Sequence, residues 1–137
     1  MWKYYALLSA LFAALTAILA KIGLKGINSN LATAIRTVII LLLAWGIVAF
    51  SGEARDIKNL SRQNLIFLIL SGMATGLSWI FYFKALATGP VSKVAPIDKL
   101  SVALTICLSA IFLKESLDAK TIVGGLLILA GTFVLIR

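Results

Sequence analysis

The chain has 137 residues, of which 61% are apolar and 13% are charged, and its net charge is +8. Soluble domains are about 45–50% apolar and about a quarter charged, so this composition indicates a protein that dissolves in a lipid bilayer. The basic residues are dispersed near the ends of apolar runs and form no aromatic-basic patch, which argues against nucleic-acid binding. Cys107 is the single cysteine and histidine is absent, so we expect no intrachain disulfide, no cysteine–histidine metal site and no cofactor.

The first apolar run, residues 2–24, is predicted to cross the bilayer, because about twenty apolar residues span its core. A signal peptide is the alternative interpretation of Lys3 followed by an apolar run. The run is too long for the hydrophobic region of a signal peptide, and Ile18-Leu19-Ala20 lacks the small residues of a cleavage site. We therefore predict a first transmembrane helix.

The connector after this run contains Gly26, which suits a helix end, and Ser29 or Asn30, either of which suits the N-cap of the next helix. The second predicted span covers residues 31–50 and carries Arg36 beside two threonines. A polar loop over residues 53–63 follows.

The third predicted span, residues 64–87, has two distinct faces. One is a hydroxyl stripe, and the other, roughly 100° around the helix, combines small and aromatic residues. The first holds Ser71, Thr75, Ser78 and Tyr82, and the second holds Gly72, Gly76, Trp79 and Phe83. Glycines four residues apart allow close helix packing. The hydroxyls either border a cavity or bond to the carbonyl four residues earlier in their own helix.

The fourth predicted span, residues 91–113, follows a turn at Gly89-Pro90. Asp98 heads a stripe that continues through Ser101, Thr105 and Ser109, whereas Lys99 points about 100° away, so we do not expect it to be the partner of Asp98. An ionisable side chain inside the bilayer costs about 2.5–3.5 kcal/mol and is a candidate for function. Alternatively, the helix begins at Pro96, and Asp98 is then an ordinary carboxylate near a helix N-terminus.

The fifth predicted span, residues 119–136, is preceded by Asp118, a suitable N-cap, and followed by Arg137 as an interfacial anchor. Five spans place the two termini on opposite sides. The basic residues then divide almost evenly, with six on one side (Lys3, Arg55, Lys58, Arg62, Lys114, Lys120) and five on the other (Lys21, Lys25, Lys84, Lys93, Arg137). Such a small bias is consistent with a chain that inserts in both orientations and pairs as an inverted dimer. Alternatively, basic residues buried in the helix bundle obscure the charge bias of a chain with one orientation.

Several segments resemble the EamA-type repeat of the drug/metabolite transporter superfamily. They are Ile22-Gly23-Leu24-Lys25, Tyr82-Phe83-Lys84-Ala85-Leu86, Phe112-Leu113-Lys114-Glu115-Ser116-Leu117 and the glycine-rich stretch 124–131. Most relatives carry two inverted repeats around a central cavity, so the resemblance implies that a second copy or a related five-span partner completes the cavity here. Gly124 and Gly131 also resemble the helix-packing seam of the small multidrug-resistance branch. That branch uses a glutamate in its first helix, and the first span here has no acidic residue.

We therefore predict an all-α membrane protein, with residues 1–137 forming one five-helix domain that is half of a drug/metabolite transporter fold. The predicted function is transport of a small polar or anionic metabolite across the inner membrane by alternating access in an inverted homodimer. A flippase component for a lipid-linked head group and a non-transporting assembly subunit are the alternatives. No nucleophile–base pair, phosphate loop or metal motif suggests an enzyme. The substrate- or ion-pathway candidates are Arg36, Ser78, Trp79, Tyr82, Asp98, Lys99 and Thr105, and the helix-packing candidates are Gly72, Gly76, Gly124 and Gly131.

Overall fold

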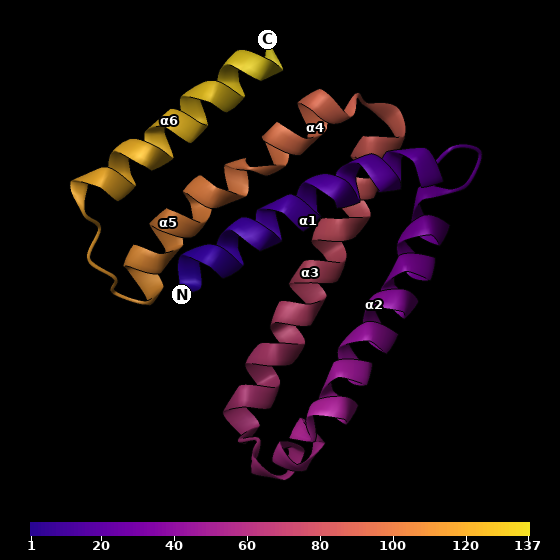
Figure 1. Ribbon diagram of the computed structural model, residues 1–137. Coiled ribbons are helices and arrows are strands. Elements are labelled where there is room, and N and C mark those ends of the chain that lie inside the picture. Colours follow the sequence, from indigo (N-terminus) through magenta and orange to yellow (C-terminus); the bar gives the residue numbers. More distant parts are fainter. The chain divides into compact units, whose positions relative to one another are not determined.

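The computed structural model describes residues 1–137, which form helices joined by short connectors (Figure 1). The elements are α1 (Trp2–Gly23), α2 (Ser29–Ser51), the 3-10 helix η1 (Glu53–Asn59), α3 (Arg62–Thr88), α4 (Val91–Asp98), α5 (Leu100–Phe112) and α6 (Ala119–Ile136). Five segments are long and apolar enough to cross a membrane: α1, α2, α3, the consecutive pair α4–α5, and α6. The predicted all-α, five-span fold class is confirmed.

The chain forms two compact units, which we describe separately. One comprises residues 19–87, which include the end of α1, helix α2, η1 and nearly all of α3. The other comprises residues 1–18 and 88–137, which include most of α1 and helices α4, α5 and α6. We call them the groove unit and the packed unit, after features described below.

Side-chain caps set the starts of α2 and α6. The side chain of Asn28 accepts a hydrogen bond of 2.8 Å from the Asn30 N–H, so Asn28 is the N-cap of α2, and the prediction of Ser29 or Asn30 was wrong by one or two positions. The side chain of Asp118 accepts a bond of 3.0 Å from the Thr121 N–H, which confirms Asp118 as the N-cap of α6. Each cap satisfies a backbone donor that has no partner within its helix.

The fourth span starts at Val91 but is not one uninterrupted helix, because it breaks at Lys99 between α4 and α5. Pro96 lies inside α4, where its ring crowds the carbonyl one turn earlier and it has no N–H to donate. At the break, the Lys99 N–H donates to the Pro96 carbonyl and the Val102 N–H donates to the Lys99 carbonyl, both at 3.0 Å and both with the three-residue spacing of a 3-10 turn. Asp98 is therefore the last residue of α4, not a carboxylate in the first turn of a helix.

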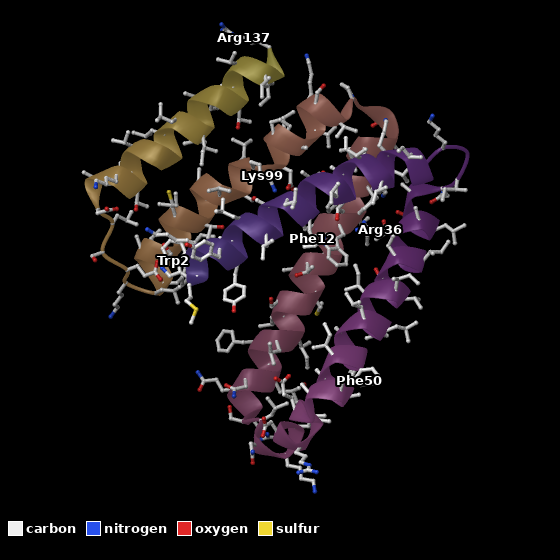
Figure 2. All side chains as sticks on the ribbon, viewed as in Figure 1. Trp2, Phe12, Arg36, Phe50, Lys99 and Arg137 are labelled. Carbon is white, nitrogen blue, oxygen red and sulfur yellow. The ribbon has the colours of Figure 1, made fainter.

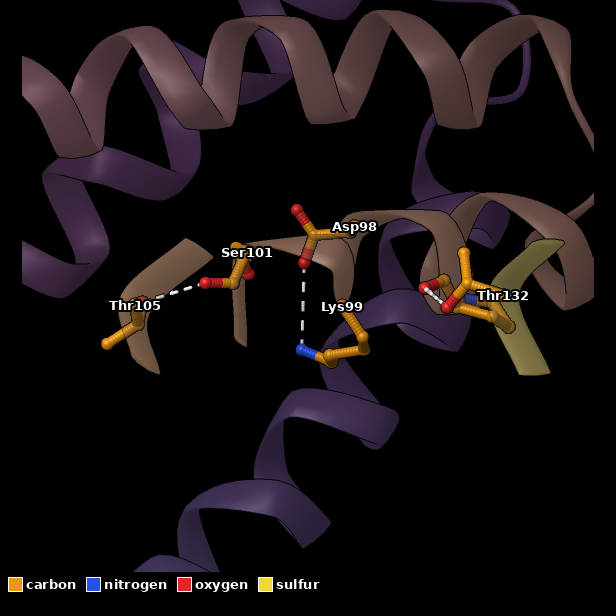
Figure 3. Close-up of polar contacts among 6 residues, drawn as sticks. Asp98, Lys99, Ser101, Thr105 and Thr132 are labelled. Atoms are coloured by element: carbon orange, nitrogen blue, oxygen red, sulfur yellow. Dashed lines mark hydrogen bonds and ion pairs between the residues drawn. The ribbon is translucent and has the colours of Figure 1, made fainter. Parts of the chain in front are cut away.

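In the packed unit, α6 contacts both α4 and α5. Gly125 makes the close approach, since a Cβ atom at this position would lie 3.1 Å from Ile106 Cδ1 of α5. Seven residues later, Thr132 is only 3% exposed, and its hydroxyl donates to the Ile128 carbonyl at 2.9 Å while lying 3.4 Å from the Pro96 carbonyl of α4 (Figure 3). The buried stripe of α6 thus runs through Gly125 and Thr132.

The predicted packing glycines Gly124 and Gly131 lie one position earlier, about 100° around the helix. A Cβ atom at either would meet nothing within 4 Å, so neither contacts another helix closely within the chain. A packing role for them remains a prediction about contacts with a second molecule.

In the groove unit, Lys21 near the end of α1 donates from Nζ to the Leu86 carbonyl of α3 at 2.5 Å. In a continuous helix this carbonyl would accept from the N–H four residues later, but that residue is Pro90, which has no N–H. The lysine therefore satisfies a carbonyl that the sequence leaves without its helical donor, and its positive charge suits the C-terminal end of a helix.

Candidate functional site

A groove of about 900 Å³ lies between α2 and α3 in the groove unit. Its volume falls within the range of small-molecule sites, about 300–1,000 Å³. Each helix contributes one stripe with the three- and four-residue spacing of a helical face. The lining residues are Asn30, Thr33, Ala34, Thr37, Val38 and Leu41 from α2, and Leu68, Ser71, Gly72, Thr75, Gly76, Trp79 and Ile80 from α3.

Gly72 and Gly76 form part of the α3 wall of this groove. A Cβ atom at either position would meet nothing within 4 Å, so the glycines do not bring two helices into contact within the chain. Their predicted packing role is not seen here. Instead, the absence of side chains at two successive turns leaves room in the middle of the groove.

The threonine hydroxyls of the groove are oriented by their own helices. Thr33 donates to the Ser29 carbonyl at 2.9 Å, and Thr37 donates to the Thr33 carbonyl at 2.8 Å. Thr75 donates to the Ser71 carbonyl at 2.9 Å. These bonds match the predicted alternative for membrane hydroxyls, in which the proton goes to the carbonyl four residues earlier. Because each proton is already donated, the oxygen lone pairs are the remaining hydrogen-bonding capacity, and the threonines act as acceptors.

Arg36 lies beside the groove and is not one of its lining residues. Its guanidinium carbon lies 4.3 Å from the centroid of the Phe83 ring, a cation–π contact between α2 and α3. Phe83 is 1% exposed and also meets the Tyr82 ring edge-on, with centroids 5.8 Å apart. Since Phe83 follows Trp79 by one turn of α3, the stacked arginine lies about one turn beyond the end of the lining stripe.

Asp98 and Lys99 lie in the packed unit and pair with each other, with 3.6 Å between the carboxylate and ammonium groups (Figure 3). The prediction that Lys99 is not the partner of Asp98 was therefore wrong. The break at Lys99 disturbs regular helical spacing, and the long lysine stem bridges the remaining angle. Their side chains are 54% and 37% exposed, for Lys99 and Asp98 respectively. Thr105 donates to the Ser101 carbonyl at 2.7 Å, so it too bonds within its own helix.

Of the predicted pathway residues, only Trp79 lines the groove, together with Ser71 and Thr75 of the predicted hydroxyl stripe. Ser78 is exposed but is not one of the lining residues, and Tyr82 is half-buried against Phe83. The α2 wall of the groove was not predicted from the sequence. The polar residues Asn30, Thr33 and Thr37 are spaced along one helical face and could have indicated it.

The exposed surface of the spanning helices is strongly apolar and indicates a membrane environment. Large apolar side chains are exposed along every spanning helix, including Leu11, Leu42, Phe67, Leu104 and Leu127. Such a surface is unfavourable in water and suits hydrocarbon, whereas the polar groups of the groove lie between two spans. Together they define a helical membrane protein with several spans and a partly polar groove. No group of three or more His, Cys, Asp or Glu side chains lies together to hold a metal ion.

The EamA-like transporter family model matches residues 1–137. The chain therefore belongs to the EamA-like transporter family, as its sequence motifs predicted. It is 46% identical over 134 residues to a Sinorhizobium protein named "Uncharacterized transporter in cobO 3'region", covering 98% of this chain and 95% of the relative.

Two partial matches are more distant. An uncharacterized protein of Methanocaldococcus jannaschii is 30% identical over 81 residues, 59% of each chain. The NIPA-like protein 2 of Mus musculus is 37% identical over 71 residues, which cover 51% of this chain and 18% of the mouse protein. No solved structure matches this chain. The family and the Sinorhizobium relative identify a membrane transporter with several spans and point away from an enzyme.

Proposed function

We propose that the α2–α3 groove is half of a transport pathway for a small polar or anionic metabolite. Two copies in opposite orientations would close it and expose it alternately to the two sides of the inner membrane. The observation that carries this proposal is a groove of about 900 Å³ that lies between two membrane spans and is lined by threonines and a tryptophan. The nearly even division of basic residues supports inverted pairing.

The residues around the groove have distinct roles in this proposal. The threonine oxygens accept hydrogen bonds from hydroxyl or N–H groups of the substrate, and Trp79 supplies a flat apolar wall. Arg36 attracts an anionic group at the end of the groove, because its charge is held there by Phe83 rather than by a carboxylate.

The Asp98–Lys99 pair would act at a second point of the cycle. A substrate carboxylate would compete with Asp98 for the lysine. This exchange would change the local charge in step with transport, which is the kind of change that biases a two-state equilibrium.

Transport by the protein reconstituted in liposomes tests these roles. We expect uptake of a metabolite found by thermal-stabilisation screening to fall by at least about tenfold in Arg36→Gln, since a lost charge-assisted hydrogen bond costs about 1.5–3 kcal/mol. Trp79→Ala should also reduce uptake, because it removes the flat apolar wall of the groove. Asp98→Asn should also change uptake, because it removes the carboxylate that pairs with Lys99. Trp2→Ala and Arg137→Gln, which change the same residue types far along the chain, are the controls. Wild-type uptake in both groove variants would contradict the proposed site.

Orientation has its own test. In a Cys107→Ser background, Lys3→Cys is labelled with a membrane-impermeant maleimide, either from outside intact cells or from the opposite side in inverted membrane vesicles. Inverted pairing predicts partial labelling from each side, and cross-linking between Lys3→Cys of one copy and Arg137→Cys of another. Labelling from one side alone would exclude the inverted arrangement. It would not test the groove as a transport pathway, which the uptake assay tests separately.

A further inference from the structure

The 3-10 helix η1, which connects α2 to α3, has three chemically distinct faces. A 3-10 helix has about three residues per turn, so side chains three positions apart eclipse one another. The sequence Glu53-Ala54-Arg55-Asp56-Ile57-Lys58-Asn59 repeats with this period. Its apolar face is Ala54 and Ile57, its basic face is Arg55 and Lys58, and its acidic and amide face is Glu53, Asp56 and Asn59.

The orientation of η1 is set by its junction with α2. Gly52 has a φ of +77°, a left-handed conformation that ends α2 and turns the chain back. The helix then contacts the end of α2, where Ile57 borders a hollow of about 240 Å³ together with Trp45 and Val48. Glu53 borders the same hollow, so the apolar face and part of the acidic face are turned toward α2.

The basic face is left without a partner in the chain. Arg55 and Lys58 are exposed, and neither forms an ion pair, although Glu53 and Asp56 are close in sequence. The reason is geometric, because the three-residue period places opposite charges about 120° apart around a 3-10 helix. Arg62, the first residue of α3, adds a third unpaired cation at the end of the loop.

The position of η1 in the chain indicates which kind of molecule its basic face would meet. The loop joins two membrane spans, so it lies at the boundary between hydrocarbon and water. Phe50, just before the turn, is 95% exposed, and Trp45 belongs to the residue type that favours this boundary. Figure 2 shows nitrogen-tipped side chains extending from the loop below α2 and α3, beyond the labelled Phe50. We propose that the basic face of η1, formed by Arg55 and Lys58 with Arg62 beside it, binds the head groups of anionic phospholipids.

Lipid binding by the purified full-length protein tests this proposal. The protein in an uncharged detergent is titrated with phosphatidylglycerol or with phosphatidylcholine of identical acyl chains, and bound lipid is counted by native mass spectrometry. A lysine or arginine near an anionic surface contributes about 1 kcal/mol, or about fivefold in affinity. Arg55→Gln/Lys58→Gln should therefore weaken phosphatidylglycerol binding about 25-fold and leave phosphatidylcholine binding unchanged.

Two double variants serve as matched controls. Lys25→Gln/Lys93→Gln removes the same charge outside η1 and should keep wild-type affinity, whereas Glu53→Gln/Asp56→Gln removes the acidic face and should maintain or tighten binding. Equal weakening by the Lys25/Lys93 variant, or binding within twofold of wild type in the Arg55/Lys58 variant, would overturn the proposal. If the Arg55/Lys58 variant loses helical circular dichroism, the salt dependence of lipid binding by the wild-type protein replaces this comparison. Added salt should weaken the binding of phosphatidylglycerol but not of phosphatidylcholine, and salt-independent binding of phosphatidylglycerol would overturn the proposal.

Discussion

Glycine has opposite roles in the two units of this chain. In the packed unit, Gly125 lets α6 approach α5 until Ile106 Cδ1 would lie 3.1 Å from an added Cβ atom. In the groove unit, Gly72 and Gly76 face open space and contribute to the wall of the α2–α3 groove. The same residue type in the same kind of apolar helix therefore serves contact in one place and volume in the other.

The threonines differ in a parallel way. Thr132 of α6 is buried and lies close to a carbonyl of α4 as well as bonding to its own helix. Thr33, Thr37 and Thr75 bond to their own helices and line the groove. Hydroxyls and small residues thus occur both at a packed helix interface and along an open groove, and the position of the neighbouring helix decides which.

The largest expected loss of stability distinguishes a glycine that makes a close helix contact from a glycine that does not. Gly125→Leu should lower the free energy of unfolding by about 1–3 kcal/mol, because the new side chain must displace Ile106 from a close-packed contact. Gly124→Leu, where a Cβ meets nothing within 4 Å, should leave it nearly unchanged. Unfolding by sodium dodecyl sulfate in mixed micelles measures both. Equal losses in the two variants would show that the contact with Ile106 is not special.

A comparable loss is expected where Lys21 joins α1 to α3 in the groove unit. Lys21→Met keeps the apolar stem but removes the bond from Nζ to the Leu86 carbonyl, and loss of a partner by a buried polar group costs about 1–3 kcal/mol. We expect about 1–2 kcal/mol in the same assay, since Lys21 is only half-buried. Lys25→Met, at an exposed lysine of the connector, is the control and should have wild-type stability.

Removing one hydroxyl from each unit should give a smaller difference in the free energy of unfolding. Thr132→Val keeps the side-chain shape and should cost about 0.5–1.5 kcal/mol, the usual net contribution of a hydrogen bond. Thr75→Val should change unfolding less, because this side chain faces the open groove rather than another helix. A larger loss of stability in Thr75→Val than in Thr132→Val would contradict the assignment of Thr132 to a packed interface and of Thr75 to an open surface.

The smallest effect concerns the N-cap of α6, outside the span. Hydrogen bonds from the Thr121 hydroxyl and N–H lower the pKa of Asp118 below its ordinary value of 3.8. Because the folded-state pKa is the lower one, this contribution to stability is complete above the ordinary value and is lost as the pH falls through the lowered pKa. Thermal melting from pH 7 to pH 2 should therefore show a smaller acid-induced decrease in Asp118→Asn than in wild type. Parallel curves would exclude an ionised cap.

The candidate site was only partly predictable. Trp79, Ser71 and Thr75 follow the helical stripes recognised in the sequence and do line the groove. Arg36 was predicted from its depth in a span, but its contact with Phe83 depends on how α2 meets α3. Asp98 and Lys99 were predicted to point apart, and the interruption after Pro96 allowed them to pair.

The sequence alone determined the five spans, the cap at Asp118 and the family, because apolar run length, capping chemistry and local motifs all act within one segment. Only the tertiary structure decided which stripe of each helix is buried. Gly125 and Thr132 lie on the buried face of α6, and Gly124 and Gly131 lie on the neighbouring face, one position earlier in sequence. The two stripes are equally apolar in sequence, so only the packing of α6 against its neighbours decides which is buried. Lys21 likewise became the donor for Leu86 because two segments 65 residues apart in sequence meet in space, a long-range contact that no local pattern specifies.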